Sequence, residues 1–144
     1  MRSLPLIALA FAALSAGGPG PSAAPQEEKV RFNRDVRPVL AANCFLCHGP
    51  DPGSRKAKLR FDREEGFFGA REKGAMVVRG KPEASPLYQH VISKDPDEVM
   101  PPPKSKKALK PQEKEILRRW IAQGAPWEPH WSFIKPDLKR PGPE

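Results

Sequence analysis

The sequence contains two cysteines, Cys44 and Cys47, and both lie in the stretch Cys44-Phe45-Leu46-Cys47-His48. Cysteine pairs separated by two residues occur in disulfides, redox dithiols, zinc sites and attachment sites of c-type haem. These sites require different surroundings in the fold. The chemistry of this stretch therefore decides what the rest of the chain folds around.

The surrounding sequence argues against three of these sites. A disulfide across two intervening residues closes a very small loop and gives little stabilisation. A thioredoxin-like dithiol follows a strand at the start of a helix, whereas Cys44 follows a predicted helix. A zinc site needs two further ligands at metal spacing, and His90 and His130 lie far along the chain.

Haem attachment uses all three residues of the motif. Each thiol adds to one vinyl group, and the spacing lets one turn of chain present both sulfurs along one porphyrin edge. The imidazole of His48 then reaches the iron beneath the ring. The motif therefore predicts one covalent haem c, attached through Cys44 and Cys47, with His48 as the proximal ligand of the iron.

The N-terminal residues have the pattern of a secretory signal. Arg2 precedes an apolar run at residues 4–14, and a segment of small residues follows. The run is shorter than the ~20 apolar residues of a membrane-spanning helix. We expect cleavage after Ala24, export to the periplasm or another extracytoplasmic compartment, and no membrane association of the mature chain. An uncleaved anchor is the alternative.

Composition bears on the core and on the partners. The 19 prolines and the hydrophobic content of 38% leave much of the chain in loops, so a cofactor is expected to fill part of the core. The formal net charge of +8, in an exported chain, argues against nucleic acid and favours acidic protein partners.

A local basic run is either a solvated loop or a docking patch. It comprises Lys104, Lys106, Lys107 and Lys110.

Three helices are predicted. The first spans residues 35–43, with Asn33 as its N-cap, and runs directly into Cys44. The second begins after Ser85, an N-cap candidate followed by a proline. The third begins at Pro111 and ends at Gly124. Its apolar stripe comprises Ile116, Leu117, Trp120 and Ile121. The alternating residues 59–62 are compatible with a short strand that packs one side on the core.

The iron has a second axial position, for which Met76, His90, Met100 and His130 are candidates. Met100 lies in the loop sequence VMPPP, whose prolines restrict the backbone and prevent helix formation. A stiff loop of this kind suits a thioether held over a ring, and gap-filling core is the alternative role. We expect Met100 to be the distal ligand. Met76 is expected in the core. His90 is expected on a helix face, where it is solvent-exposed or hydrogen-bonded, and His130 is expected to pack in the tail.

Ligation by histidine and methionine raises the haem potential and fills both axial positions. Outer-sphere electron transfer then remains as the natural use of the iron. We also expect His48 to donate its second ring N–H to a backbone carbonyl. Arg60, Arg79 and Trp120 are candidates for the haem propionates, with solvated charge or core packing as the alternative.

These residues resemble the planctomycete-type cytochrome c domain. The resemblance covers about residues 30 to 134 and is carried by FNRDVRPVLAANCFLCHGPD, KLRFD, GKPEASPLYQHV and MPPPKSKKALKPQEKEILRRWIAQGAPWEPHWSF. It implies a small all-α class I cytochrome c fold, in which a few helices and long loops surround one covalent haem. It implies the same roles for Cys44, Cys47, His48 and Met100. Lys110 departs from the family, which tends to place Thr or Ser there, and large domains usually follow this domain in the family.

The predicted organisation is a signal peptide at 1–24, a polar lead-in at 25–32, a cytochrome c domain at 33–125 and a Pro-rich tail or linker at 126–144. The expected function is that of an exported mono-haem electron carrier with a redox protein as partner. An enzyme is not expected, because no catalytic acid, base or nucleophile constellation is present. The alternatives are an electron-feeding module of a larger assembly and, if Met100 does not bind iron, an open-site peroxidase or sensor.

Overall fold

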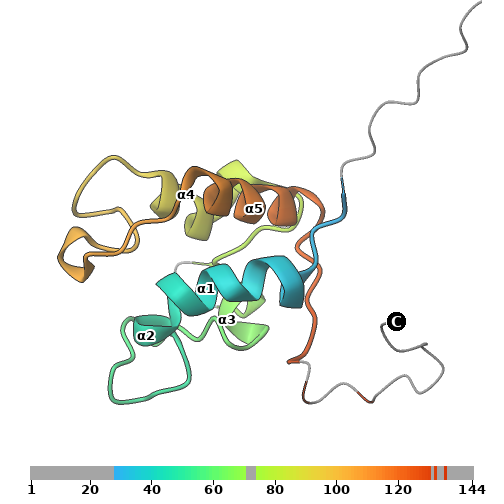
Figure 1. Cartoon of the computed structure of the whole chain (residues 1–144), viewed down its shortest axis with the longest axis horizontal. Helices are drawn as coiled ribbons and strands as arrows, with labels where there is room; N and C mark the ends of the chain where they lie inside the picture. The colour runs from blue at the N-terminus through green and yellow to red at the C-terminus, as the bar shows by residue number, and fades with distance from the viewer. Residues whose placement is uncertain (1–27, 71–73, 131, 133–134, 136–144) are drawn as a thin grey trace, which may run out of the picture.

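The computed structural model describes residues 28–70, 74–130, 132 and 135. The predicted signal peptide, residues 1–24, lies outside these residues, as do most of residues 131–144. The described residues form helices and loops without a strand, which confirms the predicted all-α fold class for this part of the chain (Figure 1). None of these helices has the length and apolar character needed to cross a membrane.

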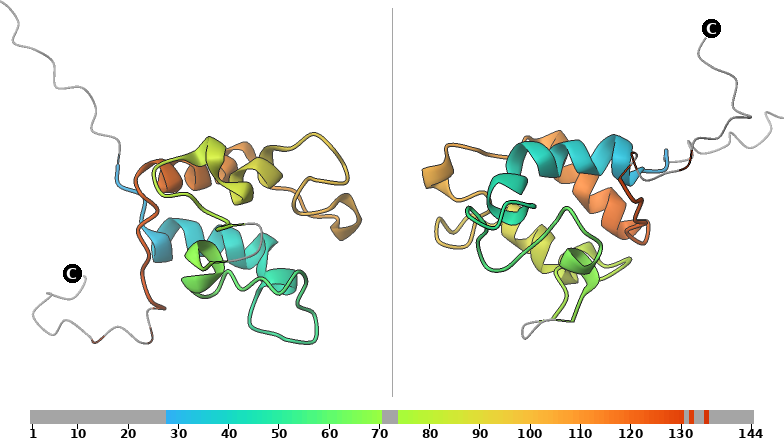
Figure 2. Two further views of the ribbon diagram at one scale, coloured as in Figure 1. Left: turned by 180° about the vertical axis from the view of Figure 1, so that it is seen from behind. Right: turned by 90° about the horizontal axis from the view of Figure 1, so that it is seen from below.

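The helices form two layers around the core. The elements are η1 (Phe32–Val36), α1 (Arg37–Asn43), α2 (Phe45–His48), α3 (Glu65–Phe68), η2 (Pro82–Ala84), α4 (Pro86–Ile92), η3 (Pro103–Ser105) and α5 (Pro111–Ala122). One layer holds α4 and α5, and the other holds α1, α2 and α3 (Figure 1). The loops that follow α2 and α4 extend to the same end of the molecule, as the second direction of view also shows (Figure 2).

The first helix begins earlier than predicted, because the π-helical turn η1 starts at Phe32 and continues into α1. Asn33 lies inside this turn and is not its N-cap. Instead, the carboxylate of Asp35 accepts a hydrogen bond of 2.7 Å from the backbone N–H of Arg31. This carboxylate satisfies one of the unpaired donors that every helix start presents.

Residues from the predicted tail complete this helix start. The backbone N–H of Asn33 donates to the Glu128 carboxylate at 2.9 Å, and the Asn33 amide donates to the carbonyl of Pro129 at 2.7 Å. The ring of Trp127 lies 4.2 Å from the ring of Phe32, measured between centroids. Phe32 and Trp127, which lie just outside the predicted domain of residues 33–125, are therefore packed against each other.

Around this contact lies a group of rings that we call the aromatic cluster. It comprises Phe32, Phe61, Phe67, Phe68, Trp120 and Trp127. Phe32, Phe67 and Trp120 are fully buried. Neighbouring rings meet in tilted, edge-on or stacked geometry. This geometry stabilises the fold beyond the contribution of the buried area alone. The cluster joins η1, α3 and α5 into one core.

Helices α4 and α5 begin where the sequence predicts, but different hydrogen bonds from those expected form at their starts. Ser85 precedes α4, yet its hydroxyl accepts from the backbone N–H of Val78 at 2.9 Å and donates to the carbonyl of Lys81 at 2.8 Å. It therefore joins the preceding loop to the helix instead of capping it. At α5, the Glu113 carboxylate accepts from the Lys110 backbone N–H at 2.7 Å. Three of the four predicted stripe residues of α5 are buried, namely Leu117, Trp120 and Ile121.

Residues 59–62 form no strand, which corrects that interpretation. The predicted packing of this segment is present, since Leu59 and Phe61 are both buried. The backbone N–H of Phe61 donates to the carbonyl of His48 at 2.8 Å. The segment is thus held by the Cys-x-x-Cys-His motif and the core instead of by a partner strand.

Candidate haem-binding site

The motif is built as a continuation of the first helix. The backbone N–H of Cys44 closes the last turn of α1 on Leu40 at 2.7 Å, and α2 begins at the next residue. The N–H of His48 donates to the carbonyl of Cys44 at 2.8 Å. One helical turn therefore separates Cys44 from His48, and both line the same cavity.

The two thiols are free in the structure and form no disulfide. Burial raises the pKa of the Cys44 thiol to about 12. A thiol with such a pKa stays protonated near neutral pH, whereas the reactive cysteine of a redox dithiol acts as a thiolate. The surroundings of Cys44 therefore argue against a redox dithiol.

The ring of His48 is oriented by the loop that follows the motif. Its Nδ1 atom lies 3.3 Å from the backbone carbonyl oxygen of Lys56. A carbonyl only accepts, so in the neutral ring Nδ1 carries the proton and Nε2 keeps its lone pair. This is the kind of partner expected for a metal-binding histidine. The particular residue, Lys56, was not identified from the sequence.

The loop between His48 and Leu59 is braced at several points. The Lys56 N–H donates to the carbonyl of Cys47 at 2.7 Å, and the Arg55 guanidinium donates to the carbonyls of Gly49 and Pro50. Ala57 and Lys58 follow in the left-handed conformation, with φ of 51° and 53°. Such conformations are costly for residues with a side chain and tend to occur at functional sites. Ala57 itself lines the cavity.

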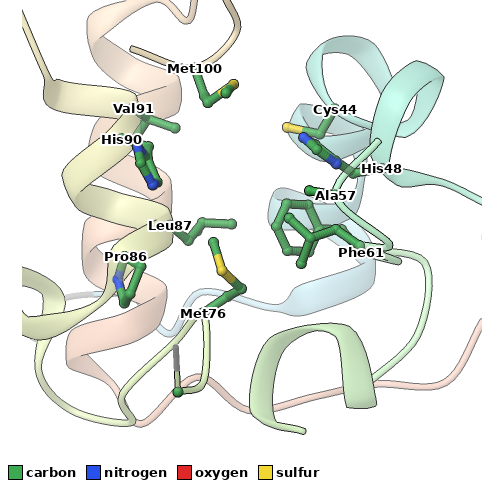
Figure 3. A pocket seen from close by; sticks show the side chains of 12 residues that line it. Cys44, His48, Ala57, Phe61, Met76, Pro86, Leu87, His90, Val91 and Met100 are labelled. Carbon is green, nitrogen blue, oxygen red and sulfur yellow. The ribbon is translucent and has the colours of Figure 1, made fainter. Parts of the chain in front are cut away.

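The cavity has a volume of about 430 Å³ and lies between the two layers of the fold. Figure 3 shows Cys44 and His48 on one wall of the cavity, and His90, Val91 and Met100 on the facing wall, which we call the distal wall. Its lining comprises Cys44, His48, Ala57, Leu59, Phe61, Gly74, Met76, Pro86, Leu87, His90, Val91 and Met100. The volume lies within the range of small-molecule and cofactor pockets.

The side chains of the lining fit a haem, and they include Cys44 and His48 but not Cys47. Most of them are aliphatic or aromatic, which suits a flat apolar ring, and the others carry imidazole nitrogens or sulfurs. These are the donors that bind haem iron in cytochromes. Within the described ranges, no three residues of the types His, Cys, Asp and Glu are grouped so as to hold a metal ion by themselves.

Of the axial candidates, Met100 lies at the mouth of the cavity and is 37% exposed. Its side chain points from the distal wall towards the side of His48 (Figure 3). Met76 packs partly against the core, as expected, but it also lines the cavity. His90 lies on α4 and is hydrogen-bonded to the carbonyl of Glu98, in agreement with the expected helix face, and it also lines the cavity. His130 lies elsewhere, with Nδ1 at 2.8 Å from the hydroxyl of Ser132.

The three candidates for the haem propionates have other contacts and do not line the cavity. Arg60 pairs with the carboxylate of Asp62. Arg79 donates to the carbonyls of Gly124 and Ala125 and lies over the ring of Phe68. The indole N–H of Trp120 donates to the carbonyl of Pro126 at 2.9 Å. These contacts agree with the alternative roles, which were surface charge for the two arginines and core packing for Trp120.

Comparison with known proteins identifies the segment that contains this site. Residues 44–104 match the family model described as Planctomycete cytochrome C. A search of curated proteins gives no match, and a search of solved structures gives none either. The matched segment begins at Cys44 and extends past Met100, so it includes the residues of both cavity walls. A cytochrome c domain implies a haem and suggests a haem-binding electron carrier. The match therefore supports a planctomycete-type cytochrome c domain at residues 44–104.

Proposed function

We propose that the protein is an exported one-electron carrier with a single covalent haem c. The observation that carries the proposal is the arrangement of the cavity. Cys44 and His48 line one apolar wall, and Met100 faces them from the other. The bound group would supply an iron centre that gains and loses one electron.

Cys44 and Cys47 would hold the group covalently. Each S–H adds across one vinyl C=C, so that a C–S bond forms and the hydrogen goes to the other vinyl carbon. This addition consumes no oxidant or reductant. His48 would bind the iron through Nε2, because its Nδ1–H is directed at the carbonyl of Lys56. Hydrogen bonding at Nδ1 makes an imidazole a better ligand.

Met100 would bind the iron from the distal wall. A thioether in this position favours the reduced iron and raises the potential. If His48 and Met100 both bind the iron, no site would remain on it for oxygen, peroxide or a substrate. This supports a carrier over an enzyme.

The basic run supports a redox partner with an acidic surface. The lysines at 104, 106, 107 and 110 are exposed and lie between Met100 and α5. The Lys107 ammonium also contacts the carbonyl of Ala42 near the end of α1, two residues before Cys44. Positive charge near the cavity mouth would attract an acidic partner at rates that fall as salt increases.

One observation favours a second function. Met100 is 37% exposed, and an exposed axial ligand is more easily displaced than a buried one. If it does not bind, an open iron position would allow peroxidase or sensor chemistry.

The spectrum of the oxidised protein distinguishes the two functions. A Met-to-iron charge-transfer band that disappears in Met100→Ala supports the carrier. A high-spin spectrum in the parent protein would contradict it and favour the open site. Matched variants of His130 should leave the band unchanged, because His130 lies away from the cavity.

A further inference from the structure

His90 contacts the loop that carries Met100 at two points. The residue lies in the last turn of α4, and the loop follows this helix. The backbone N–H of Met100 donates to the carbonyl of His90 at 3.0 Å. The ring atom Nδ1 of His90 lies 2.9 Å from the carbonyl oxygen of Glu98. The two contacts lie on either side of Val99 and therefore hold the backbone directly before Met100.

The ring contact has a defined direction. The carbonyl of Glu98 only accepts, so Nδ1 of His90 carries the donated proton. The Glu98 carboxylate lies 3.6 Å from the same nitrogen. Further bonds of the loop, from the N–H groups of Glu98 and Val99 to the carbonyl of Asp95, stiffen the turn but do not tie it to a helix.

We propose that His90 is the positioning residue for Met100. It holds residues 98–100 against α4, so that the thioether faces the cavity instead of solvent. This inference rests on the proposed function, in which Met100 is the distal ligand. It also explains how a side chain that is 37% exposed keeps a fixed place at the cavity mouth.

Two variants of His90 separate positioning from direct iron binding. In His90→Asn, the side-chain amide retains a donor close to the place of Nδ1 but has no atom at the place of Nε2. In His90→Leu, a good helix former of similar length removes the donor as well. The probe is imidazole added to the oxidised haem protein, which competes with Met100 for the iron.

We expect His90→Leu to bind imidazole about fivefold more tightly than the parent, because one net hydrogen bond no longer holds the loop. His90→Asn should remain within about twofold of the parent, since the donor to Glu98 is kept. His130→Leu is the matched control and should not change the affinity, because that histidine bonds to Ser132 away from the cavity.

Equal imidazole affinity in the parent and His90→Leu would overturn the inference. So would loss of the low-spin spectrum in His90→Asn with Met100 intact, because His90 would then be an iron ligand. Failure of the proposed function is distinguishable, since the parent protein would then lack the Met-to-iron band before any change at His90. That result would overturn the positioning role as well.

Discussion

The two ends of the core differ in what fills them. At one end, where η1, α3 and α5 meet, the rings of the aromatic cluster contact each other, and Phe32, Phe67 and Trp120 are fully buried. At the other end, α4 faces the Cys-x-x-Cys-His motif across a cavity of about 430 Å³. The first end is closed by side chains of the chain itself, whereas the second is shaped to receive a flat apolar ligand.

The two ends of the core are therefore expected to be stabilised in different ways. Burial of the aromatic cluster stabilises the first end without a cofactor. The second end encloses the cavity, and Leu46 and Met100 there are 66% and 37% exposed. Small domains with little core commonly depend on a bound group. We therefore expect changes at the two ends to have separable effects.

The largest effect is expected when the covalent link is removed. Cys44→Ala with Cys47→Ala should leave a chain without covalent haem and lower the free energy of unfolding by more than ~5 kcal/mol, most of the stability of a small domain. Thermal unfolding followed by circular dichroism checks this, with Lys81→Ala on the surface as a control. A double variant that unfolds at the parent's temperature without haem would show that the cavity end needs no cofactor.

A change at the aromatic end should destabilise the fold without altering the iron site. Trp120→Ala removes a fully buried indole and should cost about 3–5 kcal/mol. The Met-to-iron band of the fraction that stays folded should match that of the parent. Denaturant titration and the oxidised spectrum measure the two effects, and loss of the band in a folded variant would show that the ends are coupled.

A change at the distal wall should alter the iron site without destabilising the fold. Met100→Ala should keep the haem and most of the stability, because the side chain is not part of the buried core. It should lower the midpoint potential by on the order of 100 mV, a modest part of the ~0.8 V range that axial ligands set. Redox titration checks this. A potential equal to the parent's would point to another distal ligand.

The smallest effect concerns the start of η1. The hydrogen bond from the Arg34 side chain lowers the pKa of Asp35, whose carboxylate also accepts from the Arg31 N–H. A lowered pKa in the folded state means that this stabilisation is complete above the unfolded pKa of about 3.9 and disappears as the pH falls through the folded pKa.

Asp35→Asn should therefore cost about 1 kcal/mol at neutral pH and progressively less below about pH 4. Denaturant titrations of both proteins at several pH values check this. A difference that is independent of pH would mean that the carboxylate charge does not stabilise the helix start. The haem spectrum should not change at neutral pH.

The parts of this structure that were predictable are those whose signals are local. The motif residues are contiguous, so the sequence places Cys44 and His48 on one helical turn. The apolar stripe of α5 and its end at Gly124 follow from helical spacing and from a φ of 91° that suits glycine. The positions of the three predicted helices are therefore accessible from short stretches of sequence, whereas the fold class was implied by the family resemblance.

The parts that were missed depend on contacts between distant residues. Glu128 meets the backbone of Asn33 from 95 positions away, and no local pattern indicates such a pair. Ser85 has the sequence of an N-cap, but its hydroxyl bonds to the preceding loop because it is fully buried there. His90 lies at the cavity because the loop of Met100 folds back on α4.

Intact mass spectrometry of the exported protein decides whether the Cys-x-x-Cys-His motif carries one covalent haem. We expect the mass of the chain from Pro25 plus one haem, and the mass of the chain alone for Cys44→Ala with Cys47→Ala. A parent protein with the mass of the polypeptide alone, or with a haem that separates on denaturation, would show that no haem is covalently bound.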